Sequence, residues 1–132
     1  GNVKPPVDFI GSVLRALDVP AAKMPLGDER RFRIAMSAPM EQMGQPWEQP
    51  NGPDGWPEAD GDWITPQRYA ARLQWLTSAP LLLLDEVPDT REVLQTALGP
   101  LAPEGLRFAV AAAQTRIEGL ALAFAAPAFQ RM

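Results

Sequence analysis

The sequence predicts an all-α protein, an irregular bundle of five or six helices interrupted by one long Trp/Pro/Gly-rich loop. Apolar residues recur at helical spacing in most of the 132-residue chain, and prolines or capping residues bound these segments. Four prolines and four glycines fall between Gly44 and Trp63, where they disfavour a helix. No internal repeat is visible, so we expect an irregular bundle rather than a solenoid.

The first half of the chain predicts two helices. Pro5-Pro6 suits the start of a helix, and Pro20 closes the element. Its apolar face is formed by Val7, Ile10, Val13, Leu14 and Leu17. Phe32, Met36, Met40 and Met43 line one side of the second helix, in which Pro39 predicts a kink or a late start. We expect these methionines, together with Met24, to fill the core.

The second half predicts the remaining helices. Thr65 is expected as an N-cap before Pro66, and Ala79-Pro80 is expected to end that helix. Its apolar face is formed by Tyr69, Leu73 and Leu76. Leu81 to Leu84 fits either a short strand or a buried connector. Capping signatures at Asp89–Glu92 and Thr115–Glu118, and Pro103 between them, begin three more helices, the last ending before Pro127.

Composition excludes several classes of function. The net charge is −4 without a basic stripe, so nucleic acid is not an expected partner. The chain has no cysteine and no histidine, which excludes thiolate nucleophiles, disulfides, Cys/His zinc sites and imidazole bases within it. The most apolar tract, residues 106–129, contains two arginines and a glutamate and is not expected to span a membrane. The chain does not begin with Met and shows no signal peptide, so we expect a part of a longer protein.

The loop of residues 44–64 holds the candidate binding residues. It contains Trp47, Trp56 and Trp63, three of the four tryptophans of the chain. These rings, with Gln45 and Asn51, could form a contact surface for a sugar or a peptide. Alternatively, they pin the loop onto the helices, a role the sequence favours because large rings gain by packing.

The charged residues near the loop allow further hypotheses. Five acids lie in it, but the Asp60-Gly61-Asp62 spacing does not match an EF-hand, so we expect no metal and no cofactor. A carboxylate pair could serve as general acid and base, which keeps a hydrolytic, carbohydrate-directed enzyme as an alternative, with no catalytic residue assigned. Arg68 and Arg72 lie one helical turn apart. They could hold an anion, but we favour contact with the acids of the loop.

The ends of the loop resemble a known family. The run Met43-Gly44-Gln45-Pro46-Trp47 is followed by Pro50-Asn51-Gly52, Gly55-Trp56-Pro57, Trp63-Ile64-Thr65 and Arg72-Leu73. This combination resembles the C-terminal part of the bacterial domain-of-unknown-function family 1800. The segment from Lys4-Pro5-Pro6 to Leu17 and the closing Ala125 to Gln130 resemble it too, so the resemblance spans nearly the whole chain.

The resemblance implies a context for the chain. Members of the family are longer, which implies that an N-terminal helical region precedes this part. They often carry export signals, which implies an extracytoplasmic location, periplasmic or secreted. Their genes tend to lie beside those of sulfatase- and alkaline-phosphatase-like proteins, which implies such a partner. We therefore expect the helical binding or assembly module of an exported protein; an enzyme part and a purely structural cap on the N-terminal region are the alternatives.

Overall fold

Helices account for all the regular structure in residues 3–19, 29–45 and 65–131, which are the residues that the computed structural model describes. They are α1 (Pro6–Ala16), α2 (Glu29–Phe32), the π-helix η2 (Arg33–Ser37), α3 (Ala38–Gln42), α4 (Pro66–Leu83), α5 (Thr90–Ala97), the 3-10 helix η4 (Gly99–Leu101), α6 (Glu104–Ala112), α7 (Arg116–Ala125) and α8 (Pro127–Gln130). If α2, η2 and α3 are counted as one continuous helix, these residues form seven helices and a single 3-10 turn. The all-α prediction is confirmed, with one helix more than expected.

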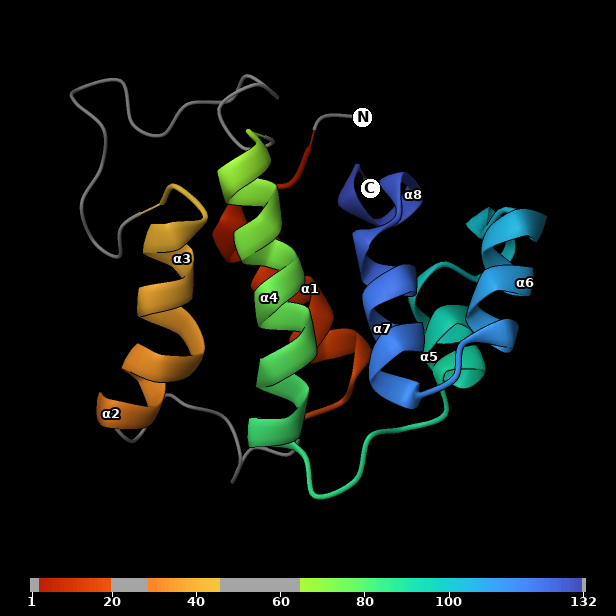
Figure 1. Cartoon of the computed structure of the whole chain (residues 1–132), viewed down its shortest axis with the longest axis horizontal. Helices are drawn as coiled ribbons and strands as arrows, with labels where there is room; N and C mark the ends of the chain where they lie inside the picture. The colour runs from red at the N-terminus through yellow and green to blue at the C-terminus, as the bar shows by residue number, and fades with distance from the viewer. Residues whose placement is uncertain (1–2, 20–28, 46–64, 132) are drawn as a thin grey trace.

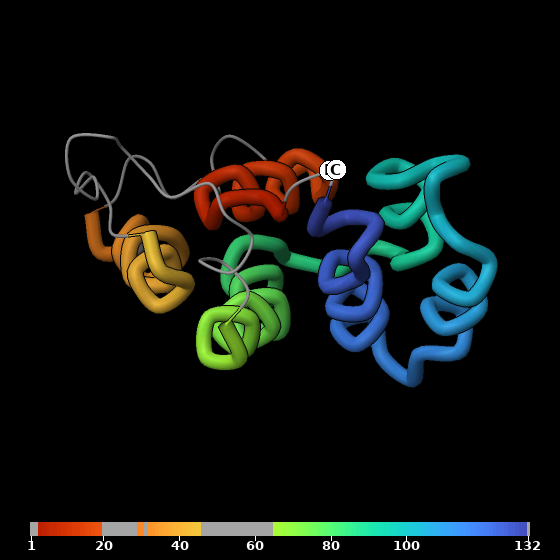
Figure 2. The backbone as a smooth tube through the Cα atoms, turned by 90° about the horizontal axis from the view of Figure 1, so that it is seen from above, coloured from red at the N-terminus to blue at the C-terminus, as the bar shows by residue number. Residues whose placement is uncertain are grey.

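The helices are arranged around α4 and α7 (Figure 1). The α2–α3 stretch runs antiparallel to α4 on one side, and α7 lies on the other side, followed by α5 and α6. Figure 2 shows α1 covering one face of this row. Both views place the two ends of the described chain next to each other, and the backbone N–H of Lys4 donates to the carbonyl of Gln130 at 2.8 Å.

The core forms where α1 meets α4, α7 and α8. The Phe9 ring contacts the Trp75 ring edge-to-face at 5.8 Å between centroids and the Phe129 ring at 6.4 Å. Phe124 packs against Phe129 at 4.8 Å. Aromatic rings bury the largest apolar areas and prefer such edge-to-face contacts, so this cluster fixes the orientation of α1 on the other helices. Met40 and Met43 are buried as predicted, and Met36 is half-buried.

A π turn lies directly before Pro39 in the second helix. The N–H of Ala38 bonds to the carbonyl of Arg33, five residues back, and this π turn leads into α3. Proline has no N–H and its ring crowds the carbonyl four residues earlier, here that of Ala35. The indole Nε1 of Trp75 donates to this buried carbonyl at 2.7 Å. A side chain of α4 thus replaces the donor that Pro39 lacks.

Two other prolines have positions in helices that the sequence did not predict, Pro80 inside α4 and Pro127 at the start of α8. Helix α4 does not end at Pro80 but continues to Leu83, so the strand and the buried connector proposed for residues 81–84 are both wrong. Pro80 and Leu83 are buried, and this packing offsets the one backbone hydrogen bond that proline removes. Pro127 ends α7 as predicted but also begins α8, since proline suits the first helical position.

The predicted caps form. The hydroxyl of Thr65 accepts from the N–H of Arg68 at 3.3 Å, the carboxylate of Asp89 from that of Arg91 at 2.9 Å, and the hydroxyl of Thr115 from that of Glu118 at 3.1 Å. Each satisfies an N–H of the first turn that has no partner within its helix. No helix in the described part of the chain is long and apolar enough to cross a membrane.

Candidate functional site

The base of the long loop is built by the end of α3. Gly44 has φ of +103°, a conformation that L side chains rarely adopt. The N–H of Gly44 bonds to the carbonyl of Glu41 at 3.0 Å, and the N–H of Gln45 bonds to that of Met40 at 2.8 Å. This bond pair is the Schellman motif, in which glycine ends a helix and turns the chain away. The chain therefore leaves α3 in a direction that is fixed by residues 43–45.

The start of α4 lies directly against this turn. A Cβ atom at position 44 would be only 2.7 Å from the Nε and Cζ atoms of Arg68. A side chain at position 44 would therefore displace the end of the Arg68 side chain. Since Thr65 caps α4 three residues before Arg68, the two ends of the loop are brought together at one point of the helical scaffold.

Gln45 is buried and ties the loop base to α1. Its side-chain oxygen accepts from the backbone N–H of Val7 at 2.9 Å. Val7 is in the first turn of α1, where backbone N–H groups have no acceptor within the helix. Pro5, at the N-cap position of α1, makes no side-chain cap. Gln45 supplies that cap from a distant part of the sequence, so the amide is occupied by the backbone of the protein.

Arg72 joins the two ends of the described chain. Its side chain is 0% exposed. One terminal nitrogen donates to the side-chain oxygen of Gln130 and the other to the carbonyl of Lys4, both at 2.6 Å. The amide nitrogen of Gln130 in turn donates to the carbonyl of Phe124 at 2.7 Å. We call these three residues, Lys4, Arg72 and Gln130, the terminal clamp.

The terminal clamp holds two cations in a largely apolar setting. Burial lowers the pKa of Arg72 to about 10. The guanidinium also lies 5.0 Å from the centre of the Phe9 ring, which is within the range of a cation–π contact. The Lys4 ammonium lies 3.5 Å from the centre of the Phe129 ring. Burial, and then the charges of Arg15 and Arg72, lower the pKa of Lys4 to about 8, while Asp8 acts in the opposite direction. The acceptors of Arg72 are neutral, so its role is to hold chain segments together.

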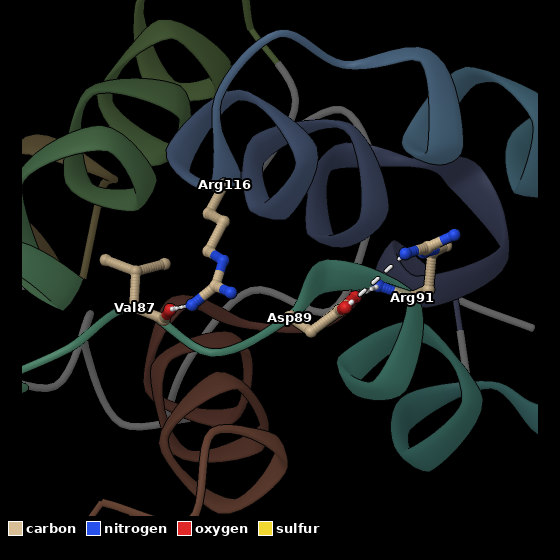
Figure 3. A network of polar contacts seen from close by, with 4 residues as sticks. All are labelled: Val87, Asp89, Arg91 and Arg116. Atoms are coloured by element: carbon tan, nitrogen blue, oxygen red, sulfur yellow. Dashed lines mark hydrogen bonds and ion pairs between the residues drawn. The ribbon is translucent and has the colours of Figure 1, made fainter.

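A polar cleft of about 300 Å³ lies between the start of α5, the end of α6 and the start of α7. Figure 3 shows its charged groups: Arg116 donates to the carbonyl of Val87 at 2.7 Å, and the Arg91 guanidinium pairs with Asp89 at 3.6 Å. The bond from the Arg91 N–H is the main reason that the pKa of Asp89 lies below its usual value. Each of these groups caps a helix or ties two segments together. The cleft is therefore explained by the packing of the helices.

A second groove, of about 310 Å³, runs between α3 and α4. It is lined by Ile34, Ala38, Pro39, Gln42, Ala71, Gln74, Trp75 and Ser78. None of these side chains carries a charge; the first belongs to η2, the next three belong to α3, and the last four belong to α4. In the described ranges, no three Asp, Glu, His or Cys side chains lie close enough to hold a metal ion.

The sequence matches the family described as "protein of unknown function (DUF1800)" over residues 1–131. The chain belongs to the DUF1800 family. No curated protein and no solved structure matches it. The predicted resemblance is confirmed over essentially the whole chain. In this DUF1800 chain, the Met43-Gly44-Gln45 run that suggested the family has a structural explanation, because it buries Met43, turns at Gly44 and caps α1 through Gln45.

Three of the predicted binding residues lie in the described part of this DUF1800 chain. Gln45 and Arg68 lie at the loop base, and Arg72 lies in the terminal clamp. Trp47, Asn51, Trp56 and Trp63 fall outside the described residues, as do the five acids of the loop, so their proposed roles stay predictions. Arg72 is buried and donates to neutral acceptors, and the predicted contact of Arg68 and Arg72 with the loop acids stays a prediction.

Sequence reasoning missed several residues of the terminal clamp and core. Lys4 and Gln130 are at opposite ends of the sequence and acquire their roles only when the ends meet. Trp75, the tryptophan outside the loop, is the donor to Ala35 and belongs to the core. Its position three residues after Arg72 and six after Tyr69 could have placed it on the buried face of α4. The hydroxyl of Tyr69 on that face donates to the carbonyl of Ala125 at 2.8 Å.

Proposed function

We propose that this DUF1800 chain is a helical binding or assembly module of an exported bacterial protein, with the tryptophan-rich loop as its contact surface. One observation carries the proposal: the loop leaves and returns to the scaffold at a single built base, formed by Gly44, Gln45, Thr65 and Arg68. Loops presented by a rigid scaffold are frequent sites of recognition.

The construction of the base supports this role. Gln45 bonds to Val7, and Arg68 fills the space above Gly44, so the base does not depend on contacts supplied by a partner. A base that is formed in advance reduces the loss of conformational freedom when the loop binds. The partner that the family context suggests is a sulfatase- or alkaline-phosphatase-like protein, and the corresponding location is extracytoplasmic.

The test compares two aromatic side chains. The full-length protein is tagged and used to capture partners from the periplasmic and culture fractions, as wild type, as Trp56→Ala and as Phe108→Ala. Phe108 is 75% exposed on α6, away from the loop base, and is the matched control. We expect Trp56→Ala to lose partners that Phe108→Ala keeps. Recovery of the same partners by Trp56→Ala would show that this residue is not the contact.

A second measurement separates recognition from loop packing. Replacing residues 46–64 by a Gly/Ser segment of equal length should leave the midpoint of thermal unfolding within a few degrees of the wild type, since long surface loops contribute little to stability. A much larger fall would mean that the tryptophans pin the loop onto the helices. The location is tested by fractionating cells that express the full-length protein at its natural level.

A further inference from the structure

The groove between α3 and α4 has features that the packing of these helices does not use. The two helices run antiparallel and side by side (Figures 1 and 2). Gln42 from α3 and Gln74 from α4 both line the groove and are exposed. Neither side-chain amide makes a hydrogen bond with any described residue, so both remain available to a ligand.

Exposed apolar side chains lie beyond the end of the groove that is lined by Ile34 and Ser78. Ile34, which lines it, is 53% exposed. Leu81 and Leu82 are 62% and 45% exposed, and they follow the groove residue Ser78 by three and four positions on α4. Residues at this spacing lie on the same face of a helix. Apolar surface therefore extends from the groove onto both helices, a pattern typical of interaction sites.

The same end of the groove carries positive charge. Arg30 precedes Ile34 by four residues, and Arg33 is its direct neighbour. Both arginines are exposed and form no ion pair or hydrogen bond through their side chains with the described residues. Arg30 and Arg33 thus place positive charge beside Ile34, in a chain whose net charge is −4.

We propose that this groove, with Arg30, Arg33, Ile34, Gln42, Gln74 and Leu81, docks an amphipathic helix of a partner protein that carries acidic residues at one end. The apolar stripe of that helix packs between α3 and α4, and its carboxylates face Arg30 and Arg33. A helix suits a groove between two helices because its side-chain ridges fit into such grooves. The acidic end follows from the sign of the two arginines.

The proposed occupant of this groove follows from the charge beside it. A nucleic acid is disfavoured by the negative charge of the chain as a whole. A different protein with an acidic helix supplies the charge that complements Arg30 and Arg33.

The test uses two designed helical peptides and the full-length protein. Both peptides have leucines at positions i, i+3, i+4 and i+7; one has two glutamates in its last turn, and the other has two lysines there. Binding of dye-labelled peptide is measured by fluorescence anisotropy at low salt. We expect the glutamate peptide to bind at least about fivefold more tightly, and the preference to shrink at high salt.

Four variants, two of them controls, decide whether this groove is the site. Arg30→Glu with Arg33→Glu should reverse the preference between the peptides, and Ile34→Asp should abolish binding of both. Leu101→Asp, an equally exposed leucine on η4, and Trp56→Ala should bind like the wild type. Circular dichroism confirms that each variant remains folded.

Several results would overturn the proposal. It fails if the two peptides bind equally, if the double arginine variant keeps the wild-type preference, or if Ile34→Asp binds normally. Self-association of the full-length protein that is lost in Ile34→Asp would identify a second copy as the occupant and would also refute it. Loss of binding in Trp56→Ala alone would move the site to the loop, which supports the proposed function but not the groove.

Discussion

Replacing Arg72 with methionine removes the central donor of the terminal clamp while keeping a long apolar side chain. In the wild type, Arg72 donates to the side chain of Gln130 and to the carbonyl of Lys4, both at 2.6 Å, and all three residues are buried. After the substitution, two buried acceptors have no donor. The change therefore tests whether a buried cation without a carboxylate partner among the described residues stabilises the fold.

The expected magnitude follows from two opposing effects. Leaving a buried acceptor without its donor costs about 1–3 kcal/mol, and here two acceptors lose one. Removing the cation also relieves an unfavourable burial, because the Nε of Arg72 has no acceptor in the described structure and burial already lowers the pKa of the group to about 10. We expect a net loss of about 2–4 kcal/mol in the free energy of unfolding. In thermal unfolding, this corresponds to a fall in Tm on the order of 10 °C.

The assay is urea unfolding followed by circular dichroism. Arg72→Lys is the charge control and should be nearly as destabilised, since one ammonium group cannot replace two parallel donors. Arg72→Met combined with Gln130→Met should lose at least about 1 kcal/mol less than the sum of the two single changes, because both remove the same bond. A free energy of unfolding for Arg72→Met within about 0.5 kcal/mol of the wild type would refute the clamp.

Four other predictions use the same unfolding assay. Gly44→Ala should cost about 1–2 kcal/mol because of its positive φ and because its Cβ displaces the Arg68 side chain; a cost below about 0.5 kcal/mol would contradict both effects. Gly119→Ala should cost about 1–3 kcal/mol, since a Cβ there would lie 2.6 Å from the Thr90 hydroxyl. Its control, Gly105→Ala, has open space around the new Cβ and should stabilise α6 by roughly 0.5–1 kcal/mol. Trp75→Phe should cost about 1–3 kcal/mol by leaving the Ala35 carbonyl without a donor. The same substitution should cost less in the Pro39→Ala variant, because residue 39 then has a backbone N–H that can bond to this carbonyl. The pKa of Lys4 is about 8 in the folded protein and 10.5 in the reference state, so the unfolded chain binds more protons between these values. The stability of the wild type relative to Lys4→Met should therefore rise as pH increases from about 8 to about 10, and a flat or falling difference would contradict the burial of this ammonium.

The sequence was most informative where the decisive interaction is local. Thr65, Asp89 and Thr115 cap their helices as predicted because each cap joins residues two or three positions apart. The apolar periodicity of α1 was equally clear, and Phe9, Ile10 and Val13 are buried. The all-α class follows from such local signals added over the chain.

Proline shows where local reasoning ends. Pro66 and Pro127 begin helices, Pro39 lies just after a π turn, and Pro80 sits inside α4. Proline costs little at the first helical position, whereas Pro39 and Pro80 each remove a backbone hydrogen bond that has to be compensated. Pro39 has its missing donor replaced by Trp75 from another helix, and Pro80 is held by burial of the last turn. Neither compensation can be seen in the neighbouring sequence.

The chain by itself thus determined its helical class, most helix starts and the family-like ends of the loop. Only the tertiary structure decided what the polar residues do. Gln45 caps α1 by accepting from the N–H of Val7, 38 residues earlier, and Arg72 joins Lys4 to Gln130 across nearly the whole sequence. The physical reason is that a buried polar group must be bonded, and its acceptor is whichever segment folding brings within reach.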